Sequence, residues 1–154
     1  MQNQIKTETR LAFIQFIFSS LFSNSSVEEC TNDFENYFYK LSVSSIEQKK
    51  ETQINFNKNY FKKLTKSYNE FINNNNIEEI INSIIKFDRN YENWDQINKS
   101  IILSILSELE MTRKEKVKTL LNDYINISKM LIPKRELGMI NAITDKYLSD
   151  RKLL

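Results

Sequence analysis

The chain has 154 residues, of which 40% are hydrophobic and 12% aromatic, and its formal net charge is +2. This composition excludes a disordered chain, and the length suits a single domain that buries most of its apolar side chains. Because the sequence has one glycine and one proline, it offers little material for hairpin turns and predicts an all-α fold with no sheet.

The first helices are expected from apolar residues at helical spacing and from polar residues that begin helices. An apolar stripe through Ile14 and Ile17 predicts a first helix over about 5–22. Two stretches, 26–29 and 44–47, have the form Ser-x-x-Glu, in which a hydroxyl and a carboxylate each bind a free backbone amide. They predict the beginnings of the second and third helices.

A long polar helix through Tyr60 and Phe71 is expected next, and it ends at the asparagine run 73–76, which is predicted to be a loop. Further helices are expected at about 77–88, at 96–110, from Thr112 and from Pro133. The predicted core contains Ile14, Phe61, Leu64, Ile105, Leu121, Ile140 and Ile143.

Residues that carry out catalysis are almost absent. Without histidine the chain has no Ser-His-Asp or Cys-His arrangement, and one cysteine, Cys30, cannot build a zinc site of the usual kind. One glycine excludes a glycine-rich phosphate loop. The paired carboxylates at 28–29, 78–79 and 108/110 are interpreted as structural. We therefore expect no enzyme, no metal, no cofactor and no catalytic residue, and a function that resides in a surface.

Cellular location and partners are suggested by cysteine content and charge. A lone cysteine is typical of a reducing compartment, and no apolar run approaches the about 20 residues of a membrane span, so a cytoplasmic protein without a membrane partner is expected. Residues 1–110 carry 12 Lys+Arg against 15 Asp+Glu, whereas residues 111–154 carry 10 against 5. This basic C-terminal part favours an anionic partner, although charge runs are commonly solvated helix faces.

Several stretches, in order and spacing, resemble the NusB family of transcription antitermination factors. The stretches 121–129 and 139–146 are similar to the family's two C-terminal helices, each of which carries an asparagine beside its apolar stripe. Residues 101–109 are similar to the family helix that ends in Tyr-Glu-Leu, and residues 10–18 to its N-terminal helix. Residues 60–64 are a further match.

The resemblance implies a fold and a function. The fold would be a single domain, 1–154, of two small packed helical bundles with six to seven helices, an N-terminal subdomain of about 1–75 and a C-terminal one of about 76–154. The protein would bind a boxA-like single-stranded RNA together with the ribosomal protein NusE, within the antitermination complex that keeps RNA polymerase processive on ribosomal RNA operons. Two alternatives remain open: an accessory RNA-binding domain acting with an RNA methyltransferase, and a helical protein-interaction scaffold without nucleic acid.

The resemblance also assigns residues to RNA. Phosphates or base edges would be contacted by Lys6 and Arg10, where the family has several arginines, while Gln15 would offer a hydrogen bond and Phe18 a stacking ring. Phe18 could equally belong to the core. The positive surface would be extended by Lys118 and Lys129.

The two asparagines, Asn122 and Asn141, are expected at the edge of the core, where an amide ties one helix to the backbone of its neighbour and fixes helix register. The alternative is that Asn122 or Asp123 faces RNA or a protein partner.

Overall fold

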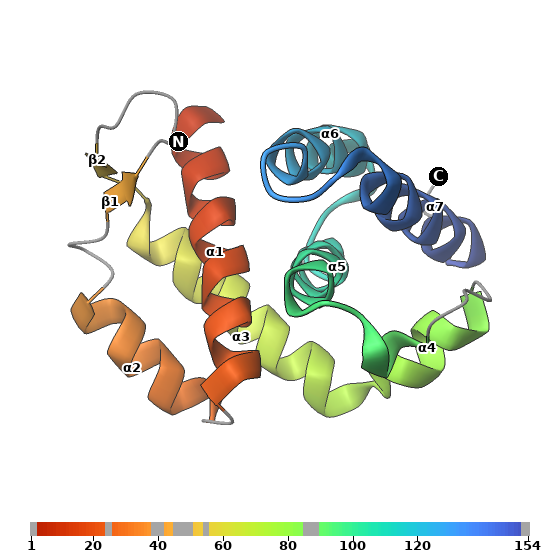
Figure 1. Ribbon diagram of the computed structural model, residues 1–154, viewed down its shortest axis with the longest axis horizontal. Coiled ribbons are helices and arrows are strands. Elements are labelled where there is room, and N and C mark those ends of the chain that lie inside the picture. The colour runs from red at the N-terminus through yellow and green to blue at the C-terminus, as the bar shows by residue number, and fades with distance from the viewer. Residues whose placement is uncertain are drawn as a thin grey trace.

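The computed structural model describes residues 3–23, 26–37, 42–44, 51–53, 56–84 and 90–151. This part of the chain forms seven α-helices, so the predicted all-α fold is confirmed (Figure 1). The helices are α1 (Asn3–Ser23), α2 (Val27–Tyr37), α3 (Lys58–Asn74), α4 (Ile77–Ile84), α5 (Gln96–Leu109), α6 (Val117–Ser128) and α7 (Lys134–Asp150). Two 3-10 turns, η2 (Tyr91–Asn93) and η3 (Lys114–Lys116), precede α5 and α6.

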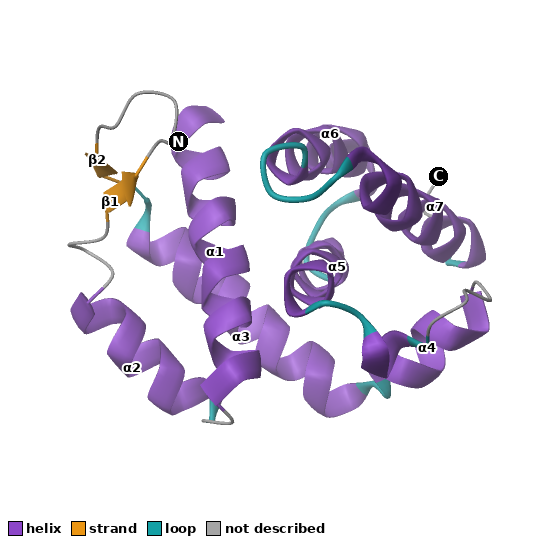
Figure 2. Ribbon diagram, in the orientation of Figure 1, coloured by secondary structure: helices purple, strands orange, loops and turns teal. Residues whose placement is uncertain are grey.

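A short hairpin corrects the prediction that the chain has no sheet (Figure 2). Strands β1 (Ser42–Ser44) and β2 (Glu51–Gln53) pair antiparallel. The helix predicted to begin at 44–47 is therefore wrong at Ser44, which lies in β1, and positions 45–47 fall outside the described residues. No apolar stripe follows this Ser-x-x-Glu motif in the sequence. A motif that can begin a helix is not sufficient by itself, because most of a helix's stability in a protein comes from packing an apolar face.

Polar side chains begin α2 and α4, whereas the helix predicted from Thr112 begins only at Val117, after the 3-10 turn η3. The Ser26 hydroxyl accepts a hydrogen bond from the Glu29 backbone N–H at 3.1 Å, at the beginning of α2. The loop predicted for 73–76 is shorter in the structure, because α3 continues to Asn74. Asn75 and Asn76 separate α3 from α4: the Asn75 amide donates to the Phe71 carbonyl at 2.9 Å, and the Asn76 side chain accepts from the Glu79 N–H at 3.2 Å. These asparagines are therefore helix-end residues, because their amides bind backbone groups that a helix leaves free.

Helix α5 lies at the centre of the fold, between α1 and α3 on one side and α6 and α7 on the other (Figure 1). Every residue of 100–109 is buried. The buried hydroxyls of Ser100 and Ser104 donate to the backbone carbonyls of Gln96 and Ile101, each at 2.7 Å. Because these polar atoms are satisfied within the helix, all faces of α5 can pack against neighbours.

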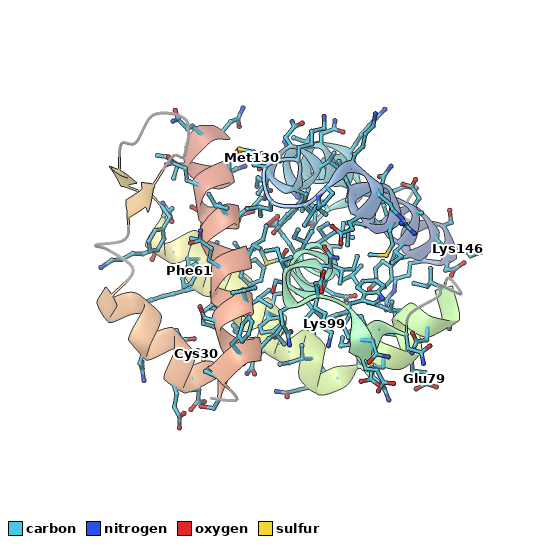
Figure 3. The ribbon with its side chains drawn as sticks, viewed as in Figure 1. Cys30, Phe61, Glu79, Lys99, Met130 and Lys146 are labelled. Atoms are coloured by element: carbon cyan, nitrogen blue, oxygen red, sulfur yellow. The ribbon has the colours of Figure 1, made fainter. Side chains whose placement is uncertain are left out.

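Aromatic rings join α1 to α3. The rings of Phe16 and Phe61 meet edge to face with centroids 5.7 Å apart, and those of Phe13 and Tyr68 do so at 6.2 Å. Phe61 lies where α3 crosses α1 (Figure 3). Such edge-to-face contacts add to the free energy gained from burying the rings.

The boundary predicted near residue 75 coincides with the junction of α3 and α4. However, α5 packs against α1 and α3 as well as against α6 and α7, and the buried apolar residues form one cluster. The division into two subdomains therefore stays a prediction.

Six of the seven residues predicted for the core are buried, namely Ile14, Phe61, Leu64, Ile105, Ile140 and Ile143. Leu121 is only partly buried, because the neighbouring Leu120 takes the inward position on α6. None of the described helices has the length and apolar character needed to cross a membrane.

Ile140→Ala should lower the free energy of unfolding by about 2–5 kcal/mol, because it removes fully buried methyl groups and leaves a cavity. Leu121→Ala should cost less, since its side chain keeps contact with water. Urea unfolding of both variants measures the difference, and equal losses would contradict the placement of the two residues.

Candidate nucleic-acid interface

Three charged side chains from three helices meet beneath the surface. Arg10 of α1 contacts Glu108 of α5 with 2.9 Å between Nη2 and Oε2, and Asp123 of α6 with 2.6 Å between Nη1 and Oδ2. The Arg10 Nε–H also donates to both Glu108 oxygens, at 3.1 and 3.0 Å. The side chains are 10% exposed for Arg10, 1% for Glu108 and 19% for Asp123. We call these three residues the charged cluster.

Two tyrosines complete the shell around Glu108. The hydroxyl of Tyr60 donates to Glu108 at 2.9 Å, and that of Tyr124 at 3.1 Å. Burial, together with the negative charge of Glu108, raises the pKa of both tyrosines above the ordinary value, so both hydroxyls keep their protons at neutral pH and act as donors. The buried carboxylate is thus satisfied by a guanidinium and two hydroxyls.

The same surroundings keep Arg10 charged. Burial alone would lower its pKa, but hydrogen bonding to Glu108 and the charge of that carboxylate raise the pKa above its ordinary value. The guanidinium carbon also lies 5.5 Å from the centroid of the Tyr124 ring, within reach of a cation–π interaction.

Asp123 joins α6 to α1 twice. One carboxylate oxygen accepts from Arg10, and the other accepts from the hydroxyl of Thr7 at 2.8 Å. These two contacts hold the N-terminal half of α1 beside α6. The space between the two helices is open to solvent.

This space is a cleft of about 600 Å³, which we call the α1–α6 cleft. The charged cluster lies at its base. Around it stand three cations, Lys6, Arg113 and Lys116, together with the amides of Asn3, Asn122 and Asn126. The lining has four cations, Lys6, Arg10, Arg113 and Lys116, against two carboxylates, Glu108 and Asp123, so its formal charge is positive.

The structure corrects the RNA-binding role predicted for Arg10. Its guanidinium is buried and bonded to Glu108 and Asp123, so it is unavailable for a phosphate unless the cluster opens. Arg10 lies one helical turn from Phe13 and Ile14, which are fully buried, and its position on that apolar stripe explains why it points inward. Lys6, one turn earlier, is half-buried and lines the cleft.

The other predicted RNA-binding residues lie outside the cleft lining. Gln15 and Phe18 are half-buried on α1, and the Phe18 ring packs against Phe22 with centroids 4.7 Å apart. Lys118 and Lys129 are exposed on α6 and at its end. The structure does not bring these four residues together with Lys6, and their role in RNA binding stays a prediction.

The structural role predicted for the two asparagines is also corrected. Asn122 and Asn141 are exposed on α6 and α7, and within the described part of the chain neither side chain ties its helix to a neighbouring one. The residue that ties α6 to its neighbour is Asp123. Asn122 instead lines the cleft, which agrees with the alternative that this part of α6 faces a partner.

The positions of Glu108 and Arg10 on apolar helix faces predict the charged cluster, whereas the net charge of the chain does not. Glu108 follows Ile101 by seven residues and lies on the same apolar face of its helix, and Arg10 lies on the apolar face of α1. A charge at a core position needs a partner of opposite sign, because a buried unpaired charge is costly. Arg113, Lys116 and Asn126 had no comparable signal, since they lie before η3, in η3 and on a polar face of α6, where nothing in the sequence marks them as facing α1.

Glu108→Gln should lower the free energy of unfolding by about 3–5 kcal/mol, because it leaves the buried Arg10 without its main counter-charge. Adding Arg10→Gln should cost less than the sum of the two single losses, by about 0.5–3 kcal/mol. Chemical denaturation of the two single variants and the double variant measures this coupling.

The exposed pair Arg113 and Glu115, 3.8 Å apart with side chains 80% and 65% exposed, provides a matched control. Glu115→Gln should change stability by less than about 0.5 kcal/mol. Additive losses in the Arg10 and Glu108 variants would show that the buried pair does not act as a unit.

Transcription antitermination proteins named NusB are similar to this chain along nearly its whole length. That of Rickettsia typhi is 25% identical over 145 residues, which are 94% of this chain and 92% of the relative. That of Rickettsia bellii is 26% identical over 149 residues, 96% of this chain and 92% of the relative, and that of Rickettsia massiliae is 23% identical over 151 residues, 97% and 94%. No family model and no solved structure matches the chain. Over nearly its whole length the chain is thus similar to NusB transcription antitermination proteins, and its all-helical fold agrees with the resemblance seen in the sequence.

Proposed function

We propose that this chain is a non-catalytic, RNA-binding transcription antitermination factor, and that the α1–α6 cleft binds single-stranded RNA. The observation that carries the proposal is the cleft itself, in which Lys6, Arg113 and Lys116 outnumber the one excess negative charge of the charged cluster. The names of its relatives, transcription antitermination proteins, support the same role.

The cleft offers groups for both parts of a nucleotide. Lys6, Arg113 and Lys116 line it, and such side chains contact phosphates without regard to sequence. The amides of Asn122 and Asn126, which also line it, each carry a donor and an acceptor and can therefore read the edges of unpaired bases.

A partner completes the proposed assembly. Following the resemblance, this partner is the ribosomal protein NusE, the RNA is a boxA-like element in nascent ribosomal transcripts, and the complex keeps RNA polymerase processive. Few cations line the cleft, and few phosphate contacts give weak binding on their own. The chain alone should therefore bind RNA poorly.

Fluorescence anisotropy with a labelled boxA-like single strand tests this function. Adding the ribosomal partner should tighten binding at least about tenfold, which corresponds to about 1.4 kcal/mol. The double variant Lys6→Gln, Lys116→Gln should weaken the complex, and the slope of log K against log salt should become shallower by about 1.4, since each contact with a single strand contributes about 0.7.

A matched control is Lys146→Gln, which removes one positive charge from α7, outside the lining of the cleft (Figure 3). It should leave both the affinity and the salt slope nearly unchanged. If wild type and partner together bind no RNA, or if the cleft variant binds as tightly as wild type, the proposed use of the cleft is wrong; weakened binding in Lys118→Gln alone would then favour the exposed surface of α6.

A further inference from the structure

A second cleft of about 690 Å³ adjoins the first. We call it the α3–α5 cleft, because its lining comes from α3 and from the two residues that follow α5, Glu110 and Met111. Tyr60 and Met111 line both clefts. A ligand that leaves the α1–α6 cleft past these two residues therefore enters the second one directly.

One face of α3 forms a wall of this second cleft and could serve as a track for an extended ligand. Lys63, Lys66, Ser67, Glu70 and Asn74 all line it, and their spacing of three or four residues places them on one face of the helix. From Tyr60 to Asn74 a helix rises about 21 Å, at about 1.5 Å per residue. Successive phosphates of one stacked strand lie about 3.4 Å apart, so the track has room for several nucleotides.

The charges along this track favour an anion. Lys63 and Lys66 are exposed, and no described acidic residue pairs with either. The lining contains two carboxylates, Glu70 and Glu110. Glu110 accepts a hydrogen bond from the Tyr147 hydroxyl at 2.7 Å and forms an ion pair with Arg151 at 2.8 Å. Its charge is therefore offset from outside the cleft, and only Glu70 opposes the two lysines.

We propose that an RNA strand held in the α1–α6 cleft continues past Tyr60 and Met111 into the α3–α5 cleft, where Lys63 and Lys66 contact its phosphates. This inference rests on the proposed RNA-binding function and adds a second binding segment to it. It makes affinity depend on RNA length, because a short strand reaches only the first cleft.

A length series of single-stranded RNA, measured with the ribosomal partner present, tests the proposal. Wild type should bind a strand of about 12 nucleotides more tightly than one of about 5, lengths within the range of known single-strand sites. The double variant Lys63→Gln, Lys66→Gln should keep the affinity for the short strand and lose the gain from length. Its salt slope with the long strand should become shallower by about 1.4, for two lost contacts.

Two controls separate a local contact from an effect of total charge. Lys134→Gln, Lys146→Gln removes the same charge from α7, outside both clefts, and should preserve the gain from length. Glu70→Gln removes the opposing carboxylate and should tighten the long strand without affecting the short one.

The outcomes distinguish this inference from the function beneath it. If wild type binds RNA of neither length, the proposed function fails and the inference fails with it. If wild type binds both but the Lys63 and Lys66 variant keeps the full gain from length, only the second segment is overturned. The second segment is equally overturned if this variant loses the ribosomal partner while its RNA-length dependence persists, because the cleft would then bind protein.

Discussion

The contact between Arg10 and Glu108 is the interaction on which the arrangement of the helices depends. It joins the first helix to the central one across 98 positions of sequence, in surroundings from which water is largely excluded. A buried guanidinium is tolerated there because two carboxylates and the Tyr60 hydroxyl accept its hydrogen bonds. Such a pair adds little net stability compared with apolar side chains, but either half left alone is strongly destabilising. It therefore selects one way of packing α1, α5 and α6.

The charges near the cleft are of two kinds, those buried in the charged cluster and those of the cations that line the cleft. Inside, Arg10 is bonded to both Glu108 and Asp123 and offsets one of their two negative charges. The tyrosines around Glu108 stay protonated because burial and the carboxylate raise their pKa. Outside, Lys6 and Lys116 line the cleft without a described acidic partner. A cleft whose walls are joined by internal ion pairs and whose rim carries cations is suited to a polyanion, because the ion pairs hold α1 beside α6 and the cations supply the attraction.

Periodicity and helix-end residues predicted most of the fold, because both are local properties. Ser26 begins a helix as predicted, and fully buried residues such as Ile140 belong to the predicted core, whereas the predicted asparagine loop is partly helical because α3 continues to Asn74. The candidate site was harder to predict, since its members are far apart in sequence. Arg10 was assigned to RNA from the family resemblance, although its position on an apolar stripe favoured burial. Asn122 is exposed, and the neighbouring Asp123 makes the contact with α1. The hairpin had no signal, because the sequence 45–50 between its two strands contains no glycine, proline, asparagine or aspartate.

The most direct test of this account is the exchange of the Arg10 Nε–H with water, followed by nuclear magnetic resonance in ¹⁵N-labelled protein with and without RNA. The Nε–H donates to both oxygens of a buried carboxylate, so its exchange should be much slower than that of the exposed Arg113 and should stay slow when RNA and the ribosomal partner are added. Exchange of Arg10 as fast as that of Arg113, or a guanidinium released from Glu108 on RNA binding, would contradict the claim that Arg10 is an internal residue that shapes the RNA-binding cleft without entering it.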